Sequence, residues 1–291
     1  MSPAFNITVI TPPDYPHVRV FDELVGQLHY SLKTLGYPSE ITASTIYSDR
    51  INIVFGIHLL PPEQIAKLPP STIIMNTEQL EAMQNGDNAR RQWFDTIMAA
   101  ARRFPTWDYD SRNIEFLHNH GIRAILWELG HQPELARIRH IDNPDVDVLF
   151  YGGINTRRRH ILNALIEQGL QVKWLFGVYG SERDAWIARS KIVLNLHAYD
   201  THIFEIVRCS YLMSNGVCVV SEVNDTTSIA PQYRNGIVAA PYEKLVETCT
   251  ALAHCEPLYR HCRRVAFDTF SRLPQSAFTR AALQKTFKHI G

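Results

Sequence analysis

The stretch VLFYGGINTRRRHILNALIEQGL, residues 148–170, reads as an apolar strand, a glycine pair, three arginines and an amphipathic helix. A strand that passes through a glycine turn into a helix is the repeating unit of a parallel sheet covered by helices. Gly152 and Gly153 allow close approach of a ligand to the backbone, and a helix start offers N–H groups to an anion. The stretch therefore predicts a phosphate site, with a solvated basic turn as the alternative.

The same alternation of candidate strands and helices continues on both sides of this stretch. It is interrupted at residues 139–147, a polar segment with a proline that indicates a linker. A chain of 291 residues with 45% hydrophobic residues can build two cores of ordinary size. We therefore expect an α/β protein with two doubly wound, Rossmann-like domains that face each other across a cleft, at residues 1–142 and 143–274.

Composition narrows the classes of function. The 29 Lys and Arg residues equal the 29 Asp and Glu residues, which argues against a protein that coats nucleic acid. The first residues show no signal-peptide pattern, and no apolar run has the length of about 20 residues that a membrane span needs. The five cysteines are odd in number and form no CxxC pair. These features predict a cytoplasmic protein with reduced thiols and no membrane span.

A histidine- and cysteine-rich segment near the end of the second domain raises the question of zinc. It contains Cys249, His254, Cys255, His261 and Cys262. Their repeat of seven residues is a helical spacing, and the tight Cys-x2–4-Cys knuckle of structural zinc sites is missing. We expect helix cysteines and no metal site.

Charged residues interrupt an otherwise apolar helix that is expected from Ile203 onward. Glu205 and Arg208 lie three positions apart, and a buried charge requires a partner or a ligand. Either they form a structural pair, or they point into the cleft, where Glu205 would bind sugar or ribose hydroxyls and Arg208 a phosphate or carboxylate. Glu222 ends the following strand, so it too is either a surface carboxylate or a hydroxyl ligand.

The stretches VDVLFYGGINTRRRHIL and, over residues 174–222, WLFGVYG through MSNGVCVVSE resemble the donor-binding half of GT-B glycosyltransferases. The similarity is greatest to the group 1 type and its CgeB-like relatives. This resemblance implies a GT-B fold, with an acceptor-side first domain and a second domain that binds a nucleotide sugar. It also implies that the last segment, 275–291, is a helix that crosses back to the first domain, and that no metal or cofactor is needed.

The sequence departs from the group 1 pattern at one point. Those enzymes carry two glutamates at a fixed spacing before the glycine that ends the helix, which corresponds to Gly216 here. Tyr211 and Ile203 occupy the two glutamate positions, and Glu205 is close to the first but out of register. The stereochemistry of transfer therefore does not carry over. The donor-binding candidates are Gly152, Gly153, Asn155, Arg157, Arg159, His197, Glu205, Arg208 and Glu222.

Candidates for the acceptor side follow the strands of the first domain. His17 lies in the loop after the first strand, where some inverting GT-B enzymes keep a catalytic histidine, and histidine is the side chain that most often acts as a general base. Asp108 is a rival base at another strand end. Asp14, Asn76 and Glu78 are acceptor-side candidates.

These observations predict a metal-independent glycosyltransferase that moves a sugar from a nucleotide sugar to a glycan, lipid, protein or small-molecule acceptor. Three alternatives remain open: a nucleotide-sugar 2-epimerase on the same scaffold, a phage-type DNA-base glucosyltransferase, and a non-catalytic glycan- or nucleotide-binding module.

Overall fold

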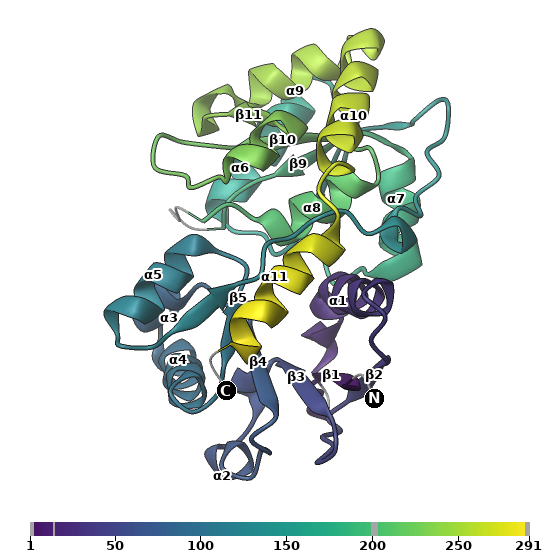
Figure 1. Ribbon diagram of the computed structural model, residues 1–291. Coiled ribbons are helices and arrows are strands. Elements are labelled where there is room, and N and C mark those ends of the chain that lie inside the picture. Colours follow the sequence, from purple (N-terminus) through teal and green to yellow (C-terminus); the bar gives the residue numbers. More distant parts are fainter. Residues whose placement is uncertain (1–2, 14, 199–202, 289–291) are drawn as a thin grey trace. The chain divides into compact units, whose positions relative to one another are not determined.

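The structure is a computed structural model that describes residues 3–13, 15–198 and 203–288. Its contacts divide the chain into two compact units, Met1–Leu129 with Pro274–Gly291, and Gly130–Leu273. Each unit is a parallel β-sheet with flanking helices (Figure 1). The prediction of two parallel sheets built from βα units is confirmed.

The first unit contains a six-stranded sheet in the order β2-β1-β3-β4-β5-β6. Its strands and helices in chain order are β1 (Phe5–Val9), α1 (Asp22–Thr34), β2 (Ser39–Ala43), β3 (Ile51–Phe55), α2 (Pro62–Ile65), β4 (Thr72–Asn76), α3 (Leu80–Gln84), α4 (Asn88–Ala101), β5 (Thr106–Asp108), α5 (Ser111–Asn119), β6 (Ala124–Leu126) and α11 (Gln275–Phe287). The strands β1, β3 and β4 are almost wholly buried, because helices cover both faces of a parallel sheet.

The last helix, α11, packs within the first unit, next to α1. Its polar residues satisfy buried groups of that unit. Thr279 accepts a hydrogen bond of 3.1 Å from the indole N–H of Trp127 and lies 2.8 Å from the hydroxyl of Ser31. Thr286 accepts a bond of 2.8 Å from the indole of Trp107. The chain end thus closes the core of the first unit by pairing the polar atoms of two buried tryptophans.

Replacement of Thr279 by valine is expected to destabilise the first unit. The isosteric side chain leaves the indole N–H of Trp127 without its acceptor, and an unsatisfied buried donor costs about 1–3 kcal/mol. Urea unfolding followed by tryptophan fluorescence measures the loss. Thr34→Val, at an exposed position of α1, is the control and should change stability by less than about 0.5 kcal/mol. Equal stabilities of both variants would contradict this account.

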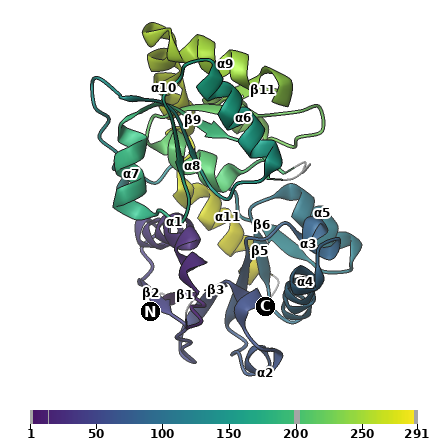
Figure 2. The same cartoon turned by 180° about the vertical axis from the view of Figure 1, so that it is seen from behind.

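The second unit contains a five-stranded sheet in the order β11-β10-β9-β7-β8. Its strands and helices in chain order are β7 (Val146–Tyr151), α6 (Thr156–Glu167), β8 (Val172–Leu175), α7 (Gly180–Ala188), β9 (Ser190–Asn195), α8 (Ile206–Ser214), β10 (Cys218–Glu222), β11 (Val238–Ala240), α9 (Leu245–Ala253) and α10 (Glu256–Phe270). Figure 2 shows the same elements from behind.

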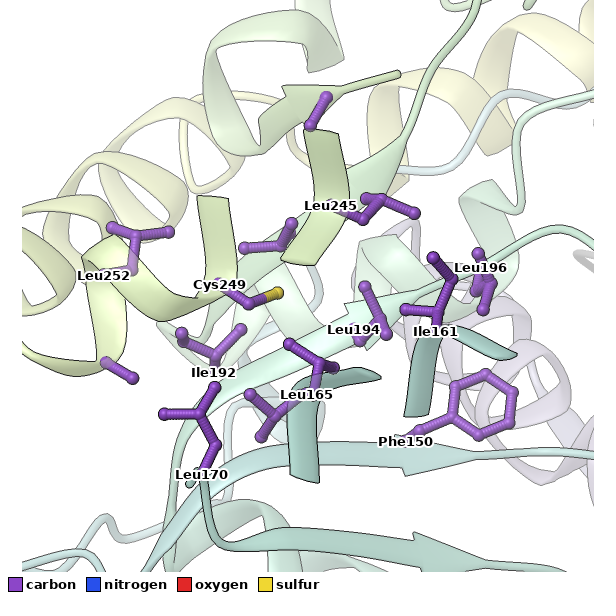
Figure 3. Close-up of a cluster of buried hydrophobic side chains, with 14 of the residues drawn as sticks. Phe150, Ile161, Leu165, Leu170, Ile192, Leu194, Leu196, Leu245, Cys249 and Leu252 are labelled. Atoms are coloured by element: carbon purple, nitrogen blue, oxygen red, sulfur yellow. The ribbon is translucent and has the colours of Figure 1, made fainter. Parts of the chain in front are cut away.

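Alternation along the strands divides the two faces of the second sheet. Ile192, Leu194 and Leu196 point to the face covered by α6 and α9, where they pack against Leu165 and Leu252 (Figure 3). The intervening residues point to the other face, where Asn195 bonds to residues at the start of α8. One face is therefore an apolar core, and the other brings polar side chains to the ends of the strands.

The division between the units falls earlier than the expected linker at residues 139–147. The reason lies in hydrogen bonds that tie the segment after Gly130 to the second unit. The side-chain oxygen of Asn215 accepts from the backbone N–H groups of Arg137 and Ile138, at 2.8 Å each. The backbone N–H of Ile141 donates to the carbonyl of Ala188 at 3.1 Å.

Candidate functional site

The order of strands in the second sheet reverses between β7 and β9. The chain proceeds from β7 to β8 on one side and from β9 to β10 on the other, so the loops after β7 and β9 leave the sheet in opposite directions. Ligands of doubly wound sheets bind at this reversal, outside the carboxyl ends of the strands. The two loops are joined by the side chain of Asn155, which donates a bond of 2.6 Å to the carbonyl of Ala198.

The two glycines after β7 differ in whether their geometry requires glycine. Gly152 has a φ of 138°, which L side chains rarely adopt, and a Cβ there would lie 3.3 Å from Nη2 of Arg208. Gly153 is exposed, and a Cβ there would be in ordinary contact with Phe176. Asn155 is the N-cap of α6 and accepts from the backbone N–H of Arg158 at 2.9 Å. The glycine loop therefore brings an arginine of α8 against its backbone.

The three arginines of α6 point to different surroundings, as successive helix positions must. Arg157 is half-buried and forms a bidentate pair with Glu222. Arg158 is buried, and its guanidinium donates to the carbonyls of Leu196 and Gly153 at 2.7 Å each. Arg159 is exposed. The structure thus brings Arg157 into the site region, while Arg159, an expected donor ligand, lies on the exposed side of α6.

Glu222 ends β10 and is only 1% exposed. One of its carboxylate oxygens accepts from Nη1 of Arg157 at 2.6 Å and from the backbone N–H of His197 at 3.1 Å. The guanidinium of Arg157 also stacks on the ring of Tyr242, 3.9 Å from its centre. The expected surface alternative for Glu222 is wrong, because the carboxylate is buried and paired. Arg157 holds this carboxylate and is not a freely available phosphate ligand.

His197 and Glu205 form a second pair beside the first. Nδ1 of His197 lies 3.0 Å from a carboxylate oxygen of Glu205, which also accepts from Asn195 at 3.0 Å. Asn195 in turn accepts from Arg208 at 2.8 Å. Glu205 stands at the N-cap position of α8, so the expected helix from Ile203 begins only at Ile206. Glu205 is thus two residues away from the group 1 glutamate position, which Ile203 occupies. Its carboxylate nevertheless belongs to the cluster around His197.

The charges of this cluster fix the protonation of His197. Burial lowers the pKa of His197, but the hydrogen bond and negative charge of Glu205, with the charge of Glu222, outweigh burial and raise that pKa above its ordinary value. Burial raises the pKa of Glu205, but His197 and then Arg208 and Asn195 lower it by more. Both shifts favour the ion pair of an imidazolium and a carboxylate.

One polar atom of the cluster stays unsatisfied. His197 is 1% exposed, and its Nε2 has no hydrogen-bond partner among residues 3–13, 15–198 and 203–288. Among the described residues three arginines lie here with two carboxylates, so their formal charge is positive even before His197 is protonated. A buried N–H donor in a positive environment suits an anionic oxygen, and the diphosphate of a nucleotide sugar has such oxygens.

A smaller cluster lies at the carboxyl ends of β4 and β5 in the first unit. Asn76 donates to Asp108 at 2.6 Å and to the carbonyl of Glu78 at 3.0 Å. The second oxygen of Asp108 accepts from the backbone N–H of Asp110, and Asp108 is 0% exposed. Burial raises the pKa of Asp108 well above its ordinary value. Both oxygens are engaged, so Asp108 organises the two loops; its expected role as a base conflicts with this burial.

Other acceptor-side candidates have different surroundings. Glu78 is half-buried, and burial raises its pKa to about 6 against the charge of Arg90. Its carboxylate lies 3.9 Å from Nε2 of His58, a buried histidine that sequence analysis missed and whose pKa burial lowers to about 4. His17 is exposed on a 3-10 helix after β1, edge-on to Tyr15. Asp14 lies outside the described residues.

The group 1 glutamate position occupied by Tyr211 belongs to a separate buried network. The hydroxyl of Tyr211 donates to Asp184 at 2.7 Å and accepts from Arg137 at 3.1 Å.

In the described part of the chain, no group of three His, Cys, Asp or Glu side chains is placed to hold a metal ion. The helices found among the described residues are too short or too polar to cross a membrane.

Sequence comparisons find relatives of unassigned activity. No protein-family model matches the chain. One uncharacterized protein of Acanthamoeba polyphaga mimivirus is 29% identical over 188 residues, covering 60% of this chain and 57% of the relative. Another from the same virus is 26% identical over 192 residues, covering 64% of this chain and 25% of the relative. The chain thus spans between a quarter and just over half the length of these two relatives.

Solved structures share the fold over nearly the full chain. Anabaena Alr3699/HepE in complex with UDP-glucose has a TM-score of 0.61 at 11% identity, covering 98% of this chain and 99% of that one. WaaG, a glycosyltransferase involved in lipopolysaccharide biosynthesis, has 0.60 at 11%, covering 97% and 99%. A T4 phage BGT mutant with UDP-glucose has 0.54 at 11%, covering 96% and 99%. The chain therefore has the α/β fold of GT-B glycosyltransferases.

Proposed function

We propose that this protein transfers a sugar from a nucleoside-diphosphate sugar to an acceptor. The observation that carries the proposal is Nε2 of the buried His197, which has no hydrogen-bond partner among the described residues and lies beside two carboxylates and three arginines at the reversal of the sheet. The CgeB-like subfamily, the absence of a metal requirement and a cytoplasmic location belong to the same proposal.

Each residue of the cluster has a role that its contacts suggest. Protonated His197 donates from Nε2 to a phosphate oxygen, and that bond strengthens as the diphosphate leaves with negative charge. Glu205 keeps the imidazolium charged and oriented. Arg208, held by Asn195 against the glycine loop, adds positive charge to the diphosphate. Glu222, held by Arg157, accepts from sugar or ribose hydroxyl groups.

The contacts of the His197 cluster do not identify the acceptor or the base that activates it. Transfer requires a group that removes a proton from the acceptor hydroxyl as the bond to the sugar forms. Glu78, with a pKa of about 6, and the exposed His17 are the candidates of the first unit, since Asp108 is enclosed. Asn76 positions this region through its bonds to Asp108 and Glu78.

A thermal-shift screen tests the donor. A nucleotide sugar present at a hundredfold excess over its dissociation constant should stabilise the protein by about 2.7 kcal/mol. The matching nucleoside diphosphate should also stabilise it, whereas the nucleoside alone should have little effect, because His197 and Arg208 meet the phosphates. A protein that no nucleoside diphosphate or nucleotide sugar stabilises would not have this function.

Product analysis then separates the alternatives. Slow hydrolysis of the bound donor identifies a transferase, and conversion of the free donor into a second nucleotide sugar identifies a 2-epimerase. Binding with neither reaction identifies a non-catalytic module. The similarity of fold to the T4 phage BGT structure is the observation that keeps a DNA acceptor among the candidates, and incorporation of labelled sugar into DNA tests it.

A further inference from the structure

A hollow of about 420 Å³ lies in the second unit, beside the turn that precedes the amino end of β10. Its wall is formed by one face of α10, where Arg260, Arg263, Arg264 and Phe267 follow the helical spacing i, i+3, i+4, i+7. The turn after α8, ending in Gly216, forms another side. The buried face of α10 carries Tyr259, Ala266 and Phe270, whereas the face at the hollow is half-buried to exposed and presents three guanidinium groups.

The lining of the hollow carries three arginines and one carboxylate, Asp268, so its formal charge is positive. Arg260 bonds to Glu256 at 2.7 Å and to the carbonyl of Asp142 at 2.7 Å. Arg263 donates to the carbonyl of Gly216 at 2.9 Å. Within the described ranges no carboxylate forms an ion pair with Arg263 or Arg264. Like charges at this spacing repel each other, so the arrangement costs stability unless an anion compensates it.

Two groups at the hollow have pKa values that are lowered mainly by burial and, to a smaller extent, by a neighbouring arginine. Burial lowers the pKa of Arg263, and the charge of Arg260 lowers it further. Burial also lowers the pKa of His140 to about 4, and Arg263 adds to that effect. His140 bonds at 2.8 Å to the carbonyl of Asn215, which lines the hollow. A negative ligand would offset the repulsion between Arg260 and Arg263.

We propose that this hollow binds a small phosphate monoester, with its phosphate on Arg263 and Arg264 and its organic part against Phe267 and Ile138. Guanidinium groups match phosphate oxygens with paired hydrogen bonds. Phe267 is 39% exposed and supplies an apolar surface beside them. The volume is in the range of small-molecule sites. A concave site in a chain with no net charge favours a small anion over a polyanion.

The hollow is separate from the proposed donor site. Gly216 precedes β10, so it lies at the amino end of that strand, whereas Glu222 lies at its carboxyl end. Helix α8 connects the two places, because Arg208 lies in its first turn and Asn215 follows its last residue. The site therefore does not depend on the proposed transfer reaction.

Calorimetric titration of the intact protein with inorganic phosphate and with glucose 6-phosphate tests the site. We expect saturable binding of one equivalent of glucose 6-phosphate, tighter than that of inorganic phosphate. Arg263→Gln and Arg264→Gln should each weaken it by roughly tenfold or more, through loss of a charge-assisted bond. Arg123→Gln, which removes the same charge from an exposed position of the first unit, should leave the affinity unchanged.

The two variants keep the test decisive. Arg263 supports Gly216, so its loss can affect folding, whereas Arg264 is exposed and its replacement should leave the fold intact. The proposal would be overturned if neither probe bound the protein. It would also be overturned if the Arg264→Gln variant bound glucose 6-phosphate as tightly as the parent. If both probes fail but duplex DNA or anionic vesicles bind through these arginines, the proposal of a small ligand is wrong. The ligand of the hollow would then be a nucleic acid or a membrane.

Discussion

Replacement of Glu205 by glutamine is expected to lower the rate of sugar transfer by about a hundredfold to a thousandfold, the usual effect of losing one preorganised donor to a leaving group. Glutamine keeps the size of the side chain and removes its charge. Without that charge, burial is the main influence on His197, and its pKa falls. A neutral imidazole with its proton held at Nδ1 can no longer donate from Nε2.

The pH dependence distinguishes this mechanism from simple loss of structure. His197 has a folded pKa above 6.5, so its pairing stabilises the protein fully below pH 6.5, and that contribution disappears as the pH rises through the folded pKa. Glu205 has a folded pKa below 4.5, so its contribution is present above pH 4.5 and is lost as the pH falls through the folded pKa. The stability difference between parent and Glu205→Gln should therefore be largest between pH 4.5 and 6.5.

Urea unfolding over a pH series measures the stability difference, and steady-state kinetics over the same series measures the rate of transfer. The basic limb of the transfer rate, where His197 loses its proton, should move to lower pH in Glu205→Gln. Glu167→Gln removes the same charge from the exposed last position of α6, at the opposite end of that helix from Arg157, and serves as the control. A basic limb that stays in place in the Glu205 variant would show that His197 is not the titrating group.

Periodicity was sufficient to predict the parallel sheets and the loop after β7. The strand through Tyr151, the glycine pair and the capped helix after Asn155 were all visible in the sequence, because local spacing encodes βα units. The prediction that Glu205 and Arg208 meet polar partners rested on the cost of buried charge. Their partner Asn195 was missed, because an asparagine at a strand end carries no comparable signal.

The contacts between distant segments were beyond sequence reasoning. The triplet Arg157–Arg159 does not reveal which arginine turns toward Glu222, because that depends on the rotation of α6 against the sheet. Arg158, left out of the predicted site, is the buried member that bonds to the carbonyls of the two loops. The burial of Asp108 follows from the neighbouring loops, which its residue type does not reveal.

Replacement of Arg157 by alanine is expected to destabilise the second unit by about 3 kcal/mol and to lower its melting temperature by roughly 10 °C. The reason is the carboxylate of Glu222, whose side chain is only 2% exposed and which would remain buried without its bidentate partner. From the sequence alone the opposite sign is expected, since a cation leaves a helix N-terminus. That effect is a few tenths to about 1 kcal/mol, and the buried pair outweighs it.

Calorimetric melting of three variants decides between the two accounts. Arg159→Ala removes an arginine two positions further along the same helix, where the side chain is exposed. It should change stability by less than about 0.5 kcal/mol. The double variant Arg157→Ala with Glu222→Gln should recover part of the loss, because a neutral amide is less costly to bury than an unpaired carboxylate. If Arg157→Ala melts like the parent and only its affinity for a nucleoside diphosphate falls, Arg157 is a phosphate ligand, as the opening stretch of sequence first indicated.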